Sequence, residues 1–444
     1  MLSALAFLVA PDTVNQRIDR VVSEALKQTP GLAVAISQEG KPVYVRAAGV
    51  ADLAGKVPVT AATRFKTGSL TKAFTAVVIQ QLASEGKLSL DDPITKRLPE
   101  GPVSWKAIKV RDLLNHTSGL VSFTDLPSFK ELMVKPGMQS QITGMVAKRP
   151  LKFSPGSKFD YSNSNYNFLG LIAERAGGAP LEILMRDRIF NPLGMSSTTL
   201  ERKGFRRPDE AEGSEVVKGK RVAPQYVEMS WPYAAGSVVS TAGDMLRWLD
   251  GLEKVLTPVM RTDAFAPRML TDGTPSFYGF GWILATWKSE PMLAHAGGIN
   301  RYSSFALRLP VRKVSLVVLT SSGEYSQVQP FAIRLLAALE GDATPAVAED
   351  PDAALTNRLR RVVDRLLVGE RDASEFTPEF LKAVPDKQWR ATGEELAGLG
   401  AVAEFRFVRE SEGAREYTLL LGPARLACIF QLDSAGRIAG FRLR

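Results

Sequence analysis

Short apolar runs near both ends of the larger part of the chain predict β-strands. Residues 31–37 and 42–48 flank a Glu-Gly pair that is typical of a hairpin turn. Residues 302–309 and 313–321 form a second such pair, and a helical pattern over 326–340 follows it. Two strand pairs so far apart in the sequence predict one sheet built from both ends of this region.

The stretch between these strands, from Ser69 to about residue 248, is rich in helical patterns and loops. Its first helix is predicted to start near Ser69, because apolar residues from Phe74 to Leu82 recur at helical spacing and Gly86 provides a stop. The patterns predict an α/β (α+β) fold in which helices flank the sheet and a mostly helical lobe is inserted. An active site is expected where the sheet meets this lobe.

Residues 342–351 are small, interrupted by proline and without periodicity, which predicts a linker. Residues 11–341 then form the larger domain, and residues 352–444 form a small α+β accessory domain. The accessory domain begins with a helical pattern, continues with a proline-capped helix at Thr377 and ends in four strand-like runs. Those runs cover residues 404–409, 416–421, 425–432 and 437–443.

The composition of the 444 residues is that of an ordinary globular protein, with 45% hydrophobic and 23% charged residues. No apolar run reaches the ~18–20 residues of a membrane-spanning helix, so no integral membrane span is expected. Cys428 is the single cysteine, which excludes an intramolecular disulfide and a multi-cysteine metal site. Because His116 and His295 are the two histidines, a histidine-rich metal centre is disfavoured, and we expect neither a metal nor a cofactor.

The net charge of +9 raises the question of a nucleic-acid partner. The basic residues between positions 201 and 222 are diluted by acidic ones and form no dense stripe with interleaved aromatic residues. The segment therefore predicts a solvated loop, and we expect no nucleic-acid partner. Residues 1–10 are apolar apart from Ser3, which predicts a signal-peptide remnant and a periplasmic or secreted protein. The alternative is a first buried segment of a cytoplasmic protein.

Ser69 and Lys72 lie three residues apart at the predicted helix start, so they share one face of the first turn. The backbone N–H groups at this end of a helix stabilise an oxyanion. A nearby amine lowers the cost of deprotonating the serine or accepts its proton. The same spacing occurs at Ser84 and Lys87, but that pair spans the predicted end of the helix. By itself, the pattern also fits a helix-capping serine.

Tyr161 and Asn163 follow a Ser-Pro-Gly turn and precede a helical run that starts near Tyr166. Two residues apart on an extended loop, their side chains point the same way. A phenolate beside an amine is a general base, and an amide can hydrogen-bond both a lysine and a substrate carbonyl. The alternative is a polar turn with a packed tyrosine.

His295, Ala296, Gly297 and Gly298 come just before the strand pair that starts at residue 302. The glycines would let an extended substrate lie along a strand edge, where a backbone N–H completes an oxyanion hole. The histidine would supply a hydrogen bond or a positive charge beside the nucleophile. The alternative is a glycine-rich hairpin entry with an incidental histidine.

The three elements, in this order, resemble the Ser-x-x-Lys, Tyr-x-Asn and Lys/His-x-Gly motifs of the serine β-lactamase and penicillin-binding protein superfamily. The Tyr-x-Asn form resembles the branch of class C β-lactamases, D-Ala-D-Ala carboxypeptidases and family VIII esterases. The resemblance covers about residues 15–340 and implies a β-lactamase-like fold with an antiparallel sheet. Further matching stretches are residues 85–93, 111–120, 153–156, 191–195 and 240–245.

The resemblance implies a role for each residue of the first two motifs. Ser69 would be the acylated nucleophile. Lys72 and Tyr161 would share its proton, deliver it to the leaving group and later activate the deacylating water. Which of the two is the base stays open, because they titrate as a coupled pair. Asn163 would orient Lys72 and the substrate.

In the third motif, the backbone N–H groups of Gly298 and Ser69 would form the oxyanion hole, and Ala296, Gly297 and Gly298 would bind substrate together with the asparagine of the second motif. His295 would take the place of the usual lysine, and Ala296 replaces the usual hydroxyl residue. In penicillin-recognising members these two side chains help to bind the substrate carboxylate. Their loss weakens the expectation of efficient β-lactamase activity.

The sequence therefore predicts a serine hydrolase that forms a covalent acyl-enzyme on Ser69 and hydrolyses an ester or amide, such as a D-amino-acid peptide or a short-chain ester. Two alternatives remain: a true class C-like β-lactamase, and a non-catalytic penicillin-binding or scaffold protein. The expected partner is a small-molecule or peptide substrate, and the oligomeric state stays open.

Three features fall outside this catalytic prediction. His116 belongs to one of the matching stretches and is expected to be structural. The accessory domain resembles small cone-shaped modules of the nuclear-transport-factor-like type, and its role stays open. Cys428 lies in an apolar strand pattern and is expected to be a buried, small hydrophobic residue.

Overall fold

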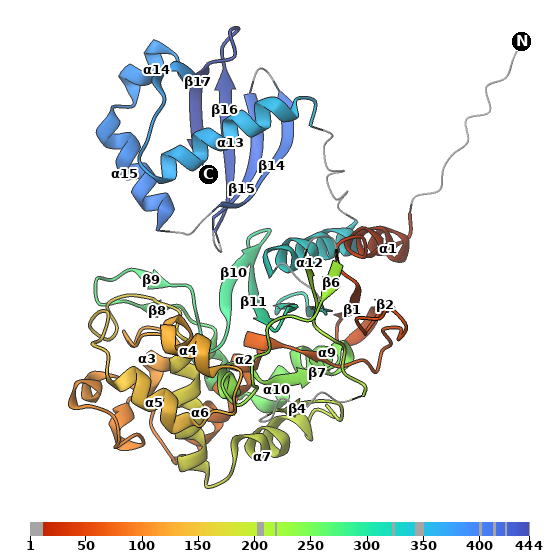
Figure 1. Ribbon diagram of the computed structural model, residues 1–444, viewed down its shortest axis with the longest axis vertical. Coiled ribbons are helices and arrows are strands. Elements are labelled where there is room, and N and C mark those ends of the chain that lie inside the picture. The colour runs from red at the N-terminus through yellow and green to blue at the C-terminus, as the bar shows by residue number, and fades with distance from the viewer. Residues whose placement is uncertain are drawn as a thin grey trace, which may run out of the picture. The chain divides into compact units, whose positions relative to one another are not determined.

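The computed structural model describes residues 12–201, 208–217, 220–321, 325–341, 350–398, 402–411, 414–421 and 424–443 (Figure 1). Contacts divide the chain into two compact units, Met1–Leu336 and Ala337–Arg444, and each is described by itself. The predicted signal segment lies outside the described residues. So do residues 342–349 of the predicted linker and residues 202–207 and 218–219 of the basic segment.

A six-stranded antiparallel sheet forms the centre of the first unit, with the strand order β10-β11-β12-β13-β1-β2. The pairing of β1 with β13 joins the two predicted hairpins and confirms a sheet built from both ends of this region. Every residue of β12 and β13 is buried, as expected for central strands that are covered on both faces. The strands are β1 (Gly31–Gln38), β2 (Lys41–Gly49), β10 (Ile283–Trp287), β11 (Glu290–Ile299), β12 (Tyr302–Leu309) and β13 (Val314–Thr320).

Helices pack on this sheet and form the predicted lobe beside it (Figure 1). Helices α1 and α12 lie side by side, joined by an ion pair between Arg334 and Glu24, and α9 packs against β1 and β13. The helices are α1 (Val14–Ala25), α2 (Thr71–Ser84), α3 (Val110–Leu114), α4 (Pro127–Leu132), α5 (Gln139–Ala147), α6 (Asn163–Gly177), α7 (Leu181–Met185), α8 (Tyr233–Gly236), α9 (Ala242–Asp250), α10 (Leu252–Val255), α11 (Pro258–Ala264) and α12 (Tyr325–Glu340).

Helix α2 is the central helix of the first unit. All of its residues from Thr71 to Gln80 are buried, and it contacts α6, α7 and α8. A helix that is buried on all sides belongs to a core, which explains why its sequence is apolar on more than one face. The predicted helix from Ser69 to Gly86 is confirmed, and it starts at the junction of sheet and lobe.

A small sheet in the order β3-β7-β4 leads into the start of α2. Its strands are β3 (Phe65–Lys66), β7 (Val238–Ser240) and β4 (Thr199–Leu200), and two further pairs are β5 (Glu215–Val217) with β6 (Lys220–Val222) and β8 (Arg268–Met269) with β9 (Pro275–Ser276). Lys66 of β3 is buried and lies 3.0 Å from Glu201 and 2.9 Å from Glu210. One ammonium thus neutralises one of two buried carboxylates just before the turn that carries Ser69.

The second unit packs three helices against a four-stranded antiparallel sheet in the order β14-β15-β16-β17. Its elements are α13 (Ala353–Leu367), α14 (Pro378–Ala383), α15 (Asp386–Ala397), β14 (Val402–Ser411), β15 (Ala414–Leu421), β16 (Ala424–Leu432) and β17 (Ile438–Leu443). The predicted cap is confirmed, because the Thr377 hydroxyl accepts a hydrogen bond from the Phe380 N–H. Cys428 is fully buried in the core of this unit, as predicted. The likeness to nuclear-transport-factor-like modules stays a prediction.

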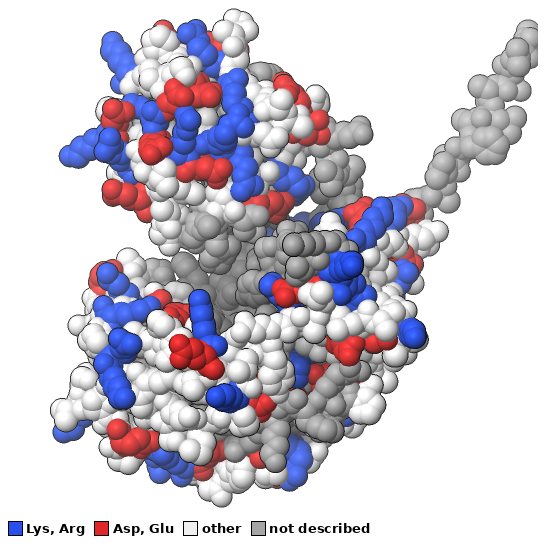
Figure 2. Space-filling model, viewed as in Figure 1, with Lys and Arg blue, Asp and Glu red and all other residues white. Residues whose placement is uncertain are grey.

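The charged side chains on the face drawn in Figure 2 are mixed, with lysine and arginine interleaved with aspartate and glutamate. In the part of the chain that the structure describes, no helix is long and apolar enough to cross a membrane.

Lys66→Met is expected to lower the free energy of unfolding of the first unit by about 3–5 kcal/mol, because it removes a buried ammonium that pairs with the buried carboxylates of Glu201 and Glu210. Lys96→Met is the matched control: it removes an exposed ion pair to Asp92 and should change stability by less than about 1 kcal/mol. Urea unfolding followed by tryptophan fluorescence measures both. Equal effects of the two substitutions would contradict the prediction.

Candidate active site

Ser69 lies in a 3-10 turn, Gly68–Leu70, that runs directly into α2. Neither this turn nor α2 is capped by a side-chain hydrogen bond, so the helix-capping role that the sequence left open for Ser69 is not the observed one. The serine is half-buried, while its neighbours Gly68 and Leu70 are buried. The nucleophile predicted from the sequence is therefore open to solvent at a helix start.

Lys72 is fully buried, and its Nζ has three polar neighbours. It lies 3.0 Å from Ser69 Oγ, 2.9 Å from Asn163 Oδ1 and 2.8 Å from the carbonyl oxygen of Ala235. Burial lowers the pKa of this amine well below its usual range. In its neutral form this amine would donate two hydrogen bonds to the two carbonyl oxygens, and its lone pair would then face the Ser69 hydroxyl.

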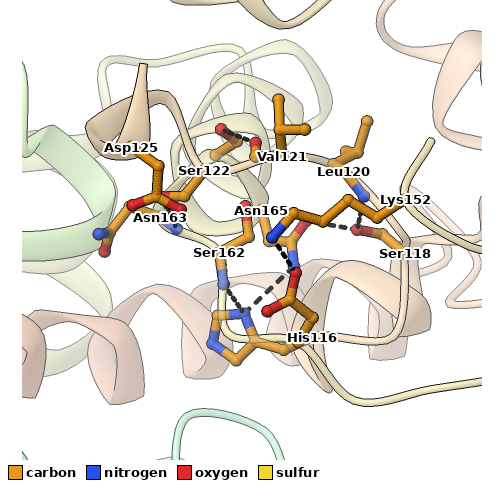
Figure 3. Close-up of polar contacts among 12 residues, drawn as sticks. His116, Ser118, Leu120, Val121, Ser122, Asp125, Lys152, Ser162, Asn163 and Asn165 are labelled. Carbon is orange, nitrogen blue, oxygen red and sulfur yellow. Dashed lines mark hydrogen bonds and ion pairs between the residues drawn. The ribbon is translucent and has the colours of Figure 1, made fainter. Parts of the chain in front are cut away.

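Asn163 is the first residue of α6 and is held on both sides. Its backbone N–H donates to Ser122 Oγ at 3.1 Å, and its amide nitrogen lies 3.2 Å from Thr124 Oγ1. This leaves its Oδ1 directed at Lys72. Figure 3 shows Asn163 beside Ser122 in the close-up. The ring of Tyr161 is centred 4.9 Å from Lys72 Nζ, so the second motif and the first meet at this amine.

His295 to Gly298 lie inside β11 itself, rather than ahead of the strand pair as the sequence analysis expected. The turn from β11 to β12 has two residues with positive φ, Asn300 at 47° and Arg301 at 62°, which is typical of a type I′ hairpin. Such a hairpin closes on a hydrogen-bonded pair, here Ile299 and Tyr302, and pairs then alternate. The N–H of Gly298 therefore points away from β12.

The outer edge of β11 is free of its other neighbour at this point. Strand β10 pairs with β11 only from Glu290 to Ala294, so it does not reach Gly298. A Cβ on Gly297 would lie 2.0 Å from the carbonyl oxygen of Thr67, and a Cβ on Gly68 would lie 2.7 Å from the nitrogen of Gly298. Glycine at these positions is what lets the strand touch the Ser69 turn. The free edge runs past the nucleophile and can accept an extended substrate.

His295 is neutral in this setting. Its Nδ1 lies 2.6 Å from the carbonyl oxygen of Ala296, which can only accept, so Nδ1 carries the proton and Nε2 accepts from the Tyr278 hydroxyl at 2.9 Å. Burial, and then the nearby Lys72, lowers the pKa of His295 to about 3. Of the two roles that the sequence left open, the structure favours a hydrogen bond and not a positive charge.

The family model of the beta-lactamase family matches residues 18–339 of the chain. The chain belongs to the beta-lactamase family. The resemblance inferred from the three motifs is thereby confirmed, and so is the α/β fold with its antiparallel sheet.

The chain is similar in sequence or in structure to several known proteins. Protein flp of Staphylococcus aureus (strain MW2) is 27% identical over 322 residues, which cover 70% of this chain and 64% of that protein, less than two thirds of its length. A beta-lactamase of Escherichia coli (strain K12) is 29% identical over 316 residues, 69% of this chain and 79% of that enzyme. The structure of D-amino acid amidase from Ochrobactrum anthropi SV3, complexed with D-phenylalanine, matches with a TM-score of 0.66 and 26% identity. It covers 74% of this chain and 99% of that chain.

Several residues that build this beta-lactamase-family site were not predicted from the sequence. Ser122 and Thr124 hold Asn163, the Ala235 carbonyl accepts from Lys72, and Tyr278 bonds His295. A backbone carbonyl leaves no signal in a sequence. Tyr278 does leave one, because it opens a Tyr-Gly-Phe-Gly-Trp run of the kind that marks a close backbone approach. The second Ser-x-x-Lys pattern is set aside correctly, since Ser84 is exposed at the end of α2.

Asn163→Asp is expected to move the acid limb of activity to higher pH. A carboxylate 2.9 Å from Nζ favours the ammonium and raises the pKa of Lys72, by about 1–3 units for such a close pair. Below that pKa the amine has no lone pair for the Ser69 proton, so kcat/KM falls as pH decreases. Profiles of kcat/KM against pH for a neutral ester measure the shift. An unmoved acid limb would contradict a neutral Lys72 as the titrating group.

Proposed function

We propose that this protein hydrolyses esters or amides through a covalent acyl-enzyme on Ser69. The observation that carries the proposal is the distance of 3.0 Å between Ser69 Oγ and Nζ of the fully buried Lys72, whose pKa burial lowers well below its usual range. A serine becomes a nucleophile when an adjacent base takes its proton in the same step. The arrangement supplies that base without a metal ligand or a cofactor.

The proposed first step forms a bond from Ser69 Oγ to the substrate carbonyl carbon while the serine proton moves to Lys72 Nζ. The negative oxygen that results is bound by the backbone N–H groups of Ser69 and Gly298. The bond to the leaving group then breaks, and the proton passes from Lys72, with Tyr161 beside it, to the leaving group. Water attacks the ester by the same route in reverse, and Ser69 is regenerated.

The residues around this centre support neutral substrates over carboxylate-bearing ones. Strand β11 contains no lysine or arginine, His295 is neutral, and Ala296 has no hydroxyl. A substrate carboxylate therefore finds no cation on the strand along which it would lie. Together with the likeness to D-amino acid amidase, this supports an amide or ester of a D-amino acid, or a short-chain ester, as the substrate.

Ser69→Ala is expected to lose at least about 10³-fold in kcat on every substrate that the wild type hydrolyses, because no covalent intermediate can form. Intact-mass spectrometry after treatment with a fluorophosphonate should show one adduct on the wild type and none on Ser69→Ala. Full turnover by Ser69→Ala would rule out the acyl-enzyme. A wild type that is labelled but hydrolyses no ester, amide or penicillin would support a non-catalytic role.

The pair of substitutions His295→Lys and Ala296→Thr is expected to raise the rate of acylation by benzylpenicillin by about ten-fold or more, because it adds a cation and a hydroxyl for the drug carboxylate. Hydrolysis of a neutral ester should not rise with it. The rates come from adduct mass and free drug measured over time. The 29% identity to the Escherichia coli beta-lactamase is the observation behind the β-lactamase alternative. Efficient penicillin hydrolysis by the unmodified protein would favour that alternative.

A further inference from the structure

His116 lies in the loop after α3 and is fully buried. Its φ is 58°, in the left-handed region that residues other than glycine and asparagine rarely adopt. Its backbone N–H donates to Leu113 at 3.4 Å, and its carbonyl accepts from the Asp160 N–H at 2.9 Å. The surrounding structure holds an unfavourable backbone conformation, which is typical of a residue whose side chain has a set position.

A directed chain of hydrogen bonds ends on the Nδ1 atom of His116. The Leu120 N–H donates to Ser118 Oγ at 3.1 Å, so the Ser118 hydroxyl donates to Asn165 Oδ1 at 2.6 Å. The Asn165 amide then donates to His116 Nδ1 at 3.1 Å, and the backbone N–H of Ser162 donates to the same atom at 3.2 Å. Figure 3 shows His116 bonded to both partners. Because Nδ1 is an acceptor, the ring proton is on Nε2.

The ring of His116 also packs against the tyrosine of the second motif. Its centroid lies 4.3 Å from that of Tyr161, with the planes tilted by 33°. Ser162, whose N–H the same histidine binds, stands between Tyr161 and Asn163 in the chain. The His116 side chain thus binds the backbone N–H of Ser162 and packs against the ring of Tyr161.

We propose that His116 is a positioning residue, which holds Tyr161 and Asn163 against Lys72 through its Nδ1 atom and the face of its ring. It is not a catalytic residue, because its acceptor atom is occupied by Ser162 and Asn165. The inference rests on the proposed function, since it is the proton transfer between Ser69, Lys72 and Tyr161 that needs this orientation.

The chain of bonds requires a neutral imidazole. Protonation would place a hydrogen on Nδ1, against two donors. The titratable groups that face His116 are Lys72 from α2, Tyr166 from α6, His295 from β11, Tyr161 and Tyr278. Burial lowers the pKa of His116 well below its usual range and keeps the acceptor available.

Two substitutions at position 116 distinguish the contribution of the Nδ1 acceptor from that of the aromatic ring. His116→Asn has an amide oxygen where Nδ1 lies and tolerates the positive φ, whereas His116→Phe keeps a ring and removes the acceptor. We expect His116→Phe to lower kcat by about 10–100-fold with KM changed by less than about three-fold, as for misplaced reacting groups. We expect His116→Asn to keep kcat within about five-fold. Both are assayed as full-length protein on a neutral ester, with active sites counted by a fluorophosphonate.

Asn165→Asp is the second test and keeps the shape of the side chain. A carboxylate only accepts, so it draws the ring proton onto Nδ1 and breaks the bond from Ser162. We expect kcat to fall by about ten-fold or more and the pH profile of kcat to change, because the imidazole now gains a partner for its charged form. If His116→Phe does not fold, the kcat of Asn165→Asp tests the positioning role of His116.

Wild-type kcat in His116→Phe or Asn165→Asp would overturn the proposal, and equal losses in His116→Asn and His116→Phe would overturn the role of the acceptor. Ser69→Ala in the same assay distinguishes failure of the proposed function from failure of the positioning role of His116. Turnover by Ser69→Ala overturns the proposed function and with it the premise for His116. Normal kcat in His116→Phe and Asn165→Asp, with Ser69→Ala inactive, overturns the positioning role alone.

Discussion

The burial of one amine governs the chemistry of this protein. Lys72 has no contact with solvent, and water is replaced around it by two carbonyl oxygens and one hydroxyl. Desolvation of a charged ammonium is far more unfavourable than that of a neutral amine, so the fold favours the form with a lone pair. The three partners come from the Ser69 turn, α6 and α8, so the packing of α2 against these elements lowers the pKa of the amine.

A second constraint is the approach of β11 to the Ser69 turn. Backbone atoms of the strand and of the turn come so close that the Cα positions of Gly68 and Gly297 have no room for a side chain. This contact aligns a free strand edge with the nucleophile and brings the N–H of Gly298 near that of Ser69. The proposed anion site would thus consist of backbone groups, which need no reorganisation during the reaction.

The region around His116 shows how buried polar groups can specify one arrangement. A neutral histidine, an asparagine and a serine are linked in a single direction, from the Leu120 N–H to Nδ1 of the imidazole, whose Nε2 has no hydrogen-bond partner among the described residues. Reversal of any one of these bonds would leave a buried donor or acceptor without a partner, at a cost of about 1–3 kcal/mol. Such a chain has one low-energy form, and that form sets the loop from Tyr161 to Asn163.

The sequence alone determined the fold class, both hairpins of the sheet and the order of the three motifs, because periodicity and short spacings act locally. Two residues three apart on a helix must share a face, which placed Lys72 beside Ser69 before any tertiary contact was known. Only the tertiary structure decided that burial lowers the pKa of Lys72 and of His295 and that the glycines lie within a strand. Those outcomes depend on partners such as Asn163 and Ala235, which are 91 and 163 residues away from Lys72 in the chain. Desolvation is a property of the assembled core, and no local pattern encodes it.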